Sequence, residues 1–141
     1  EVVVEGLRKI LDRPEFHVVS TATDGRTLVR IVDQWKPDLL IVDVTMPVLN
    51  GIDAVRQIRK ENQSTKVIFL SMHSEVAYPV EALHAGGAAY VLKSSASQEL
   101  VTAVQAVLDG KTFITAFIAD PVQQALAKRR QRSHQSEGGL T

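Results

Sequence analysis

The sequence predicts an α/β domain in which helices cover both faces of a mainly parallel β-sheet. Two hydrophobic patterns alternate along the chain: apolar residues three and four apart, typical of amphipathic helices, and short apolar runs, typical of buried strands. Strands separated by helices of this length imply right-handed crossovers and a three-layer fold. The composition agrees, because 141 residues of which 45% are hydrophobic and 23% charged are typical of one globular domain.

The first part of the chain contains two helix patterns and two strand patterns. They predict a helix over residues 3–11, a strand over 16–21, a helix over 28–35 and a strand over 39–42. Asp24 and Gly25 can begin the second helix and Pro37 ends it. No strand pattern precedes the first helix, so we expect the first strand of the sheet to be missing from this chain.

The same alternation continues through the second part of the chain. It predicts a helix over 52–58, a strand over 66–70, a helix over 76–83, a strand over 88–92 and a helix over 100–108 that Gly110 ends. Gly86 and Gly87 provide a left-handed helix stop before the last strand. Asp120 and Pro121 begin a short helix through Ala127, and a basic run at 128–132 then leads into a flexible tail.

Several classes of protein are excluded by composition. Lys+Arg and Asp+Glu number 16 each, so no overall charge attracts a polyanion or an acidic membrane. The absence of cysteine removes disulfide frameworks, thiolate zinc sites and thiol catalysis. Because no apolar run approaches the length of a membrane span and no signal peptide opens the chain, we expect a cytoplasmic protein without membrane contact.

Three polar residues stand where predicted strands end, and ligands of open parallel sheets bind at that edge. They are Asp43, Ser71 and Lys93. A carboxylate can act as a nucleophile toward a phosphoryl group, while a hydroxyl and an ammonium group stabilise the transferred oxygens. Taken singly, Asp43 and Ser71 are also ordinary turn or helix caps, and Lys93 an ordinary solvated charge.

The segments around these residues resemble the receiver domain of two-component response regulators over roughly residues 1–115. The resemblance is carried by the D-x-x-M-P-x-x-x-G run at 43–51, by Ser71, and by the sequence AYVLK at 89–93. Further details around 72–73, 85–88 and 93–96 resemble the LuxR/NarL-type branch. The resemblance implies a flavodoxin-like sheet of order 2-1-3-4-5, in which the missing first strand is central.

By that resemblance, Asp43 is the phosphoacceptor and Thr45 offers its backbone carbonyl to Mg²⁺. Ser71 is the switch hydroxyl, Tyr90 the switch aromatic residue, and Lys93 the cation that binds the phosphoryl group. The alternative for Tyr90 is a half-buried strand residue whose hydroxyl stays in water.

Phosphate lifetime and metal binding are two further expectations. Thr45 and His73 are expected to tune the lifetime of the phosphoryl group, although His73 also fits an ordinary surface loop. The family holds Mg²⁺ with an acidic pair after its first strand, and no such pair precedes Glu1. Asp24 is the one plausible substitute, and a helix cap is its other role.

We therefore expect a receiver domain over residues 1–115, followed over 116–141 by a linker helix and a basic tail leading to an absent helix-turn-helix output domain. By the same resemblance, we expect a sensor histidine kinase to phosphorylate Asp43, the phosphorylated protein to form a homodimer, and DNA to be bound only through the output domain. We do not expect the protein to be an enzyme, since its sequence lacks nucleotide-binding and hydrolase motifs. The alternatives are a pseudo-receiver that acts only through protein contacts and, more remotely, a flavodoxin-like enzyme or cofactor carrier.

Overall fold

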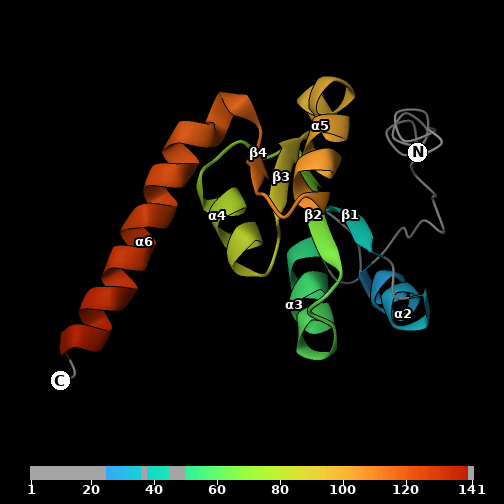
Figure 1. Ribbon diagram of the computed structural model, residues 1–141, viewed down its shortest axis with the longest axis horizontal. Coiled ribbons are helices and arrows are strands. Elements are labelled where there is room, and N and C mark those ends of the chain that lie inside the picture. The colour runs from blue at the N-terminus through green and yellow to red at the C-terminus, as the bar shows by residue number, and fades with distance from the viewer. Residues whose placement is uncertain (1–24, 36–37, 45–49, 140–141) are drawn as a thin grey trace.

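The computed structural model describes residues 25–35, 38–44 and 50–139, so the predicted helix 3–11 and strand 16–21 lie outside the described residues. The described strands form one parallel sheet in the order β1-β2-β3-β4, with helices on both faces (Figure 1). The predicted α/β class and parallel pairing are confirmed. In the same part of the chain, no helix is long and apolar enough to cross a membrane.

The elements follow each other in the predicted alternation. The strands are β1 (Leu39–Asp43), β2 (Lys66–Ser71), β3 (Ala89–Leu92) and β4 (Phe113–Ile114). The helices are α2 (Gly25–Trp35), α3 (Gly51–Glu61), α4 (Ala77–His84), α5 (Ala96–Leu108) and α6 (Ala119–Gly139), with short 3-10 turns η1 (Lys93–Ser95) and η2 (Ala116–Ile118).

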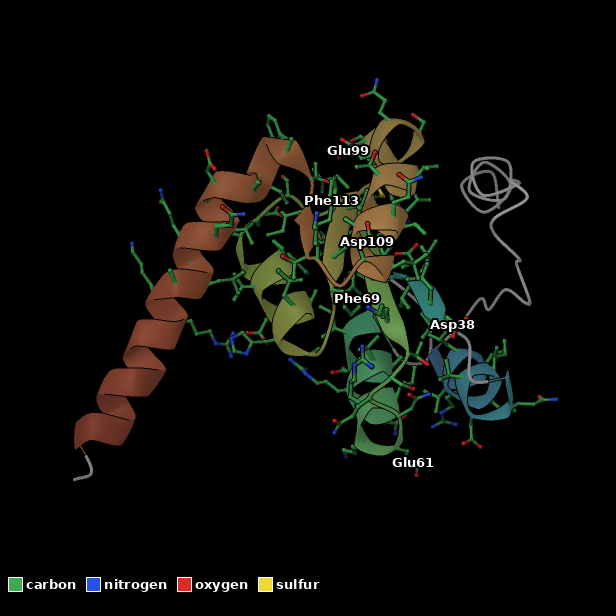
Figure 2. The ribbon with its side chains drawn as sticks, viewed as in Figure 1. Asp38, Glu61, Phe69, Glu99, Asp109 and Phe113 are labelled. Carbon is green, nitrogen blue, oxygen red and sulfur yellow. The ribbon has the colours of Figure 1, made fainter. Side chains whose placement is uncertain are left out.

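The sheet is buried on both faces because successive strand residues point to opposite sides. In β2, Phe69 belongs to a buried cluster that includes apolar residues of α2, α3, α4 and the start of α6, whereas its neighbour Ile68 belongs to a second cluster that includes those of α5. Both side chains are fully buried, and Phe69 lies at the centre of the molecule (Figure 2). A continuous apolar run is therefore the sequence signal of a strand between two helical layers.

Local signals explain where two helices begin and end. The Asn50 side chain accepts a hydrogen bond from the Asp53 backbone N–H at 2.9 Å, so Asn50 caps the start of α3. Gly86 follows the end of α4 with φ +118°, a conformation that side chains disfavour. The predicted left-handed stop is confirmed at this glycine.

The structure differs from the prediction after residue 110. β4 was not predicted, because a strand of two residues is too short to show a hydrophobic pattern. It pairs with β3 at the edge of the sheet. Thr115, the next residue after β4, strengthens this attachment, because its buried hydroxyl accepts a hydrogen bond from the Leu92 N–H at 2.8 Å. The predicted end of the last helix at Ala127 is wrong, since α6 continues to Gly139. Its apolar pattern stops near 127, but Lys, Arg and Gln are good helix formers and need no apolar face.

The turn η2 and the first turns of α6 belong to the core of the domain. Ile118 and Val122 are buried in the same cluster as Val80 of α4, and Leu126 packs against that cluster. The boundary at residue 115 stays a prediction. The segment after it is nevertheless anchored to the α4 side of the sheet at its start.

Candidate functional site

The three polar residues predicted at strand ends are placed by the register of the sheet. Asp43 ends β1 opposite Leu70, so β2 continues one residue farther, to Ser71, and Ser71 lies opposite Leu92, the last residue of β3. Lys93 follows β3 directly. Because the strands are parallel, their carboxyl ends meet at one edge of the sheet.

Lys93 binds the carboxylate of Asp43. Its Nζ donates a hydrogen bond to Oδ2 of Asp43 at 2.5 Å, across fifty positions of sequence. The side chains are 20% and 33% exposed, so the pair is sheltered yet still reached by solvent. An ammonium group next to the acceptor oxygens reduces the repulsion that an incoming phosphoryl group meets at a carboxylate.

The glycine that closes the D-x-x-M-P-x-x-x-G run is required by close contact. A Cβ atom at Gly51 would lie 2.2 Å from the carbonyl oxygen of Asp43 and 2.8 Å from Cγ1 of Val42. The backbone N–H of Gly51 donates to the carbonyl of Val44 at 3.0 Å. The start of α3 is thereby held against the end of β1, which positions the Asp43 backbone.

Ser71 and Tyr90 both bind the backbone of His73. The N–H of His73 donates to Oγ of Ser71 at 2.9 Å, and the Tyr90 hydroxyl donates to the carbonyl oxygen of His73 at 2.8 Å. Ser71 and Tyr90 are fully buried. One peptide unit of the loop after β2 therefore connects the two residues predicted to act as a switch.

Burial raises the pKa of the Tyr90 phenol to about 12, an effect that its hydrogen bond with the Ser71 hydroxyl opposes and the nearby Glu75 reinforces. The alternative of a half-buried tyrosine with its hydroxyl in water is wrong. The phenol is neutral at physiological pH and serves as a hydrogen-bond donor inside the domain.

The His73 ring stacks on Tyr78 in the first turn of α4. The ring centroids are 4.0 Å apart and the planes differ by 8°, while Nδ1 lies 3.9 Å from a carboxylate oxygen of Glu75. Tyr78 was missed by sequence reasoning, because no spacing rule pairs a loop residue with a helical residue five positions later. A role for His73 in phosphate lifetime stays a prediction.

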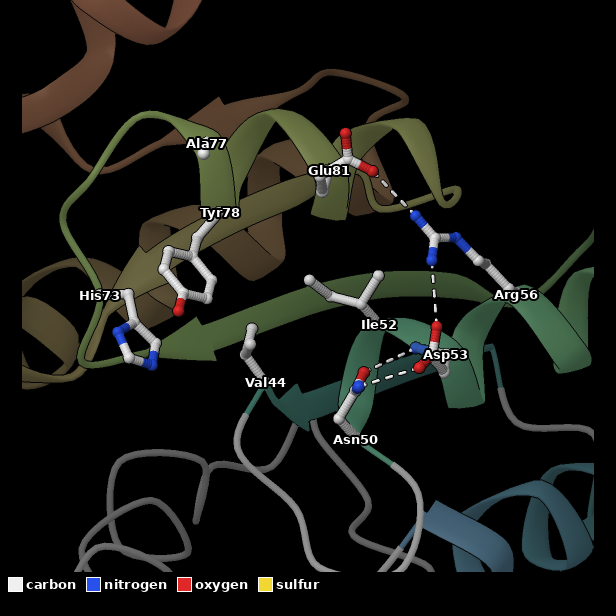
Figure 3. Close-up of a pocket in the computed structure, with 9 residues that line it drawn as sticks. All are labelled: Val44, Asn50, Ile52, Asp53, Arg56, His73, Ala77, Tyr78 and Glu81. Carbon is white, nitrogen blue, oxygen red and sulfur yellow. Dashed lines mark hydrogen bonds and ion pairs between the residues drawn. The ribbon is translucent and has the colours of Figure 1, made fainter.

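The stacked rings form one side of a groove between α3 and α4 (Figure 3). Its volume is about 480 Å³, and its lining comprises Val44, Asn50, Ile52, Asp53, Arg56, His73, Ala77, Tyr78 and Glu81. Arg56 crosses the groove and binds Asp53 on its own helix at 3.0 Å and Glu81 of α4 at 2.9 Å. The groove is therefore open beside Val44, and the ion pairs of Arg56 with Asp53 and Glu81 bridge its other end.

A magnesium site is not formed by the described residues alone. No group of three acidic or histidine side chains is close enough to hold a metal within residues 25–35, 38–44 and 50–139. Asp43 offers one carboxylate, whereas Mg²⁺ requires an octahedron of oxygen ligands. Thr45 and Asp24, both named as possible contributors, lie outside the described residues.

Comparisons with known proteins, both by sequence and by structure, match this chain to response regulators. The response regulator receiver domain family matches residues 1–105. The transcriptional regulatory protein DegU of Brevibacillus brevis is 35% identical over 78% of this chain and 47% of its own length. The response regulator UvrY of Escherichia coli K12 is 34% identical over 91% of this chain and 58% of its own length.

Solved structures of related proteins have the same fold. A LuxR-family two-component response regulator from Aurantimonas sp. SI85-9A1 superimposes with a TM-score of 0.79 at 33% identity, covering 92% of this chain and 90% of that chain. The isolated receiver domain of RcsB from Salmonella enterica serovar Typhimurium gives 0.77 at 28% identity, covering 84% and 88%.

The chain spans about half the length of these two curated relatives. Its match to the receiver domain covers most of its residues, and the aligned relatives are transcriptional response regulators. The sequence motif, the parallel sheet and the residues at its carboxyl edge agree with that match. This chain therefore belongs to the response regulator receiver domain family, and its relatives are LuxR-family response regulators.

Proposed function

We propose that Asp43 accepts a phosphoryl group from a sensor histidine kinase and that this modification controls transcription through a DNA-binding output domain outside this chain. The observation that carries the proposal is the Lys93–Asp43 ion pair at the carboxyl edge of the sheet, beside the end of β2 at Ser71. An acceptor carboxylate and a phosphoryl-binding cation are then already in contact before transfer.

The transfer is a substitution at phosphorus. An oxygen of Asp43 forms a bond to phosphorus while the bond between phosphorus and the donor histidine nitrogen breaks, and that nitrogen keeps the electron pair and regains a proton. Lys93 binds the carboxylate of Asp43 before the transfer and the negatively charged phosphoryl oxygens after it. No general base is needed, because the attacking group is the carboxylate that forms the ion pair with Lys93.

The response begins at the His73 peptide. When Ser71 donates its hydroxyl to a phosphoryl oxygen, the hydroxyl turns away from the groups it binds in the present structure, which are His73 N–H and the Tyr90 phenol. Tyr90 then has a changed partner and the loop after β2 moves with it. A change at Asp43 thereby reaches α4 through two hydrogen bonds and one peptide unit.

Phosphorylation is tested with a small phosphodonor on the natural full-length protein. Asp43→Asn should abolish the mass increase of one phosphoryl group, which is stable in acid and lost in base. Asp38→Asn is the matched control, because Asp38 is exposed at the other end of the same strand. Incorporation that persists in Asp43→Asn places the acceptor elsewhere, and no incorporation in the parent protein favours the pseudo-receiver alternative.

We further propose that phosphorylation requires Mg²⁺, takes place in the cytoplasm and produces a homodimer. A chelator added before the phosphodonor should therefore prevent phosphorylation, whereas a chelator added afterwards should not remove the phosphoryl group. The kinase and this domain meet in the cytoplasm. Phosphorylation is expected to produce a homodimer, which sedimentation of both forms detects.

DNA is bound through the output domain, and the basic run of α6 is not proposed as a sequence reader. Lys128, Arg129, Arg130 and Arg132 can attract phosphates, but no aromatic residue or second helix in this run reads bases. Residues 1–141 should therefore show only weak, salt-sensitive binding without preference between promoter and scrambled DNA. A tenfold preference, about 1.4 kcal/mol, would contradict this.

A further inference from the structure

Helix α6 is attached to α4 by two kinds of contact. Near its start, Val122 is buried in the core together with Val80 of α4, and Leu126 packs against that core. One turn later, Nη1 of Arg129 donates a hydrogen bond to Oε1 of Glu81 on α4 at 2.8 Å. Beyond this point α6 extends away from the rest of the domain (Figure 1).

Glu81 has two arginine partners from two different helices. Its Oε1 binds Arg129 of α6, and its Oε2 binds Arg56 of α3 at 2.9 Å. The side chains are partly exposed, between 41% and 48%. The hydrogen bond from Arg129, more than any other favourable contact, lowers the pKa of Glu81. If Arg129 moves away, the carboxylate keeps Arg56, so losing one partner does not leave the charge unpaired.

The same helix also contacts the predicted switch. Tyr78 stacks on His73, whose peptide binds Ser71 and Tyr90. Glu81 lies three residues after Tyr78, and residues at this spacing are neighbours on one helical surface. A shift of the first turn of α4 therefore moves the carboxylate that holds Arg129.

We infer that the Glu81–Arg129 pair holds the part of α6 that follows Leu126 against α4 in the unphosphorylated protein, and that phosphorylation breaks this pair while Glu81 remains bound to Arg56. This inference rests on the proposed function. Two discrete arrangements result: Glu81 bound to both arginines, or to Arg56 alone. The regulated segment is the helix that leads toward the proposed output domain, so its position transmits the state of Asp43.

Hydrogen exchange of α6 amides in the natural full-length protein measures this release. Arg129→Gln should speed exchange in α6 about 1.5- to 5-fold, which corresponds to the usual strength of a partly exposed ion pair. Lys128→Gln is the matched control, since it removes the same charge from the adjacent, exposed position. Equal exchange in the two variants would overturn the inference.

Glu81→Gln tests the pair from the other helix. It should produce the same increase in α6, and the double variant Glu81→Gln/Arg129→Gln should add little to either, because both remove one interaction. Additive effects would overturn the pair as the link between the helices. Arg56→Gln should leave α6 closer to its parent exchange rate than Arg129→Gln does.

Phosphorylation provides the last comparison, with phosphoryl content measured by intact mass in each sample. In the parent protein, phosphorylation should speed α6 exchange to the level of unphosphorylated Arg129→Gln, and in that variant it should add little. If phosphorylation speeds α6 exchange by the same factor in Arg129→Gln as in the parent, it does not act by breaking the Glu81–Arg129 pair, and the inference is wrong. Absence of phosphoryl from Asp43 would overturn the proposed function and the release step together, whereas the pair itself is judged by the unphosphorylated variants.

Discussion

Replacing Tyr90 by phenylalanine tests the buried hydrogen bond of the predicted switch. The change keeps the ring in the core and removes the hydroxyl that donates to the carbonyl of His73 at 2.8 Å. A hydrogen bond of this kind contributes about 1 kcal/mol to stability. At pH 8 we therefore expect the free energy of unfolding of Tyr90→Phe to be lower than that of the parent by about 1 kcal/mol.

The difference should change sign or vanish in alkali, because the pKa of Tyr90 is raised from 10.0 to about 12 in the folded state. The stability that accompanies the protonated phenol is complete below about pH 10 and is lost as the pH rises toward 12. At pH 11, the unfolded chain has released most of this proton and the folded chain has not. The loss is about one pKa unit, or roughly 1.4 kcal/mol.

Urea unfolding at pH 8 and pH 11, followed by circular dichroism, measures both values. The parent should lose about 1.4 kcal/mol more than Tyr90→Phe between the two pH values, since other groups titrate equally in both proteins. Tyr78→Phe keeps Tyr90 and the stacked ring, so it should retain the steep loss of the parent. A gap between parent and Tyr90→Phe that is unchanged from pH 8 to pH 11 would refute the buried, neutral phenol.

Three other substitutions test the acceptor edge. Gly51→Ala should lower stability by about 1–3 kcal/mol, because the added Cβ meets the Asp43 carbonyl oxygen at 2.2 Å; a melting temperature equal to that of the parent would contradict this. Lys93→Ala should reduce phosphorylation strongly and stability by about 1 kcal/mol or less, and parallel losses would indicate a structural role. His73→Ala should shorten the lifetime of the aspartyl phosphate, because the ring with Tyr78 closes one side of the groove; an unchanged decay rate would return His73 to an ordinary loop role.

The fold was largely predictable because its signals are local. In β2, Phe69 and Ile68 face opposite helical layers, so an unbroken apolar run was enough to predict a buried parallel strand. Parallel pairing then placed Asp43 and Lys93 at one edge without any knowledge of side-chain contacts. The roles of these residues in phosphorylation are not determined by that geometry and remain proposals.

Other features depended on contacts between distant residues. The Tyr90 hydroxyl binds a carbonyl 17 residues away, and Arg129 binds a carboxylate 48 residues away. Such pairs are decided by how helices and loops pack, so no spacing in the sequence announces them. For this reason the burial of Tyr90, the stacking of Tyr78 and the double pairing of Glu81 were found only in the structure.

By itself the sequence determined the alternation of helices and strands from residue 25 to residue 108, the buried character of the sheet and the polar residues at its carboxyl edge, since periodicity and strand direction are properties of neighbouring residues. Tertiary structure alone decided the addition of β4 and the partners of the switch residues. The continuation of α6 to Gly139 has a local cause, because Lys, Arg and Gln are good helix formers, but it follows no apolar pattern in the sequence. The physical reason is that a two-residue edge strand has no apolar period of its own, so that only its backbone hydrogen bonds to the neighbouring strand define it.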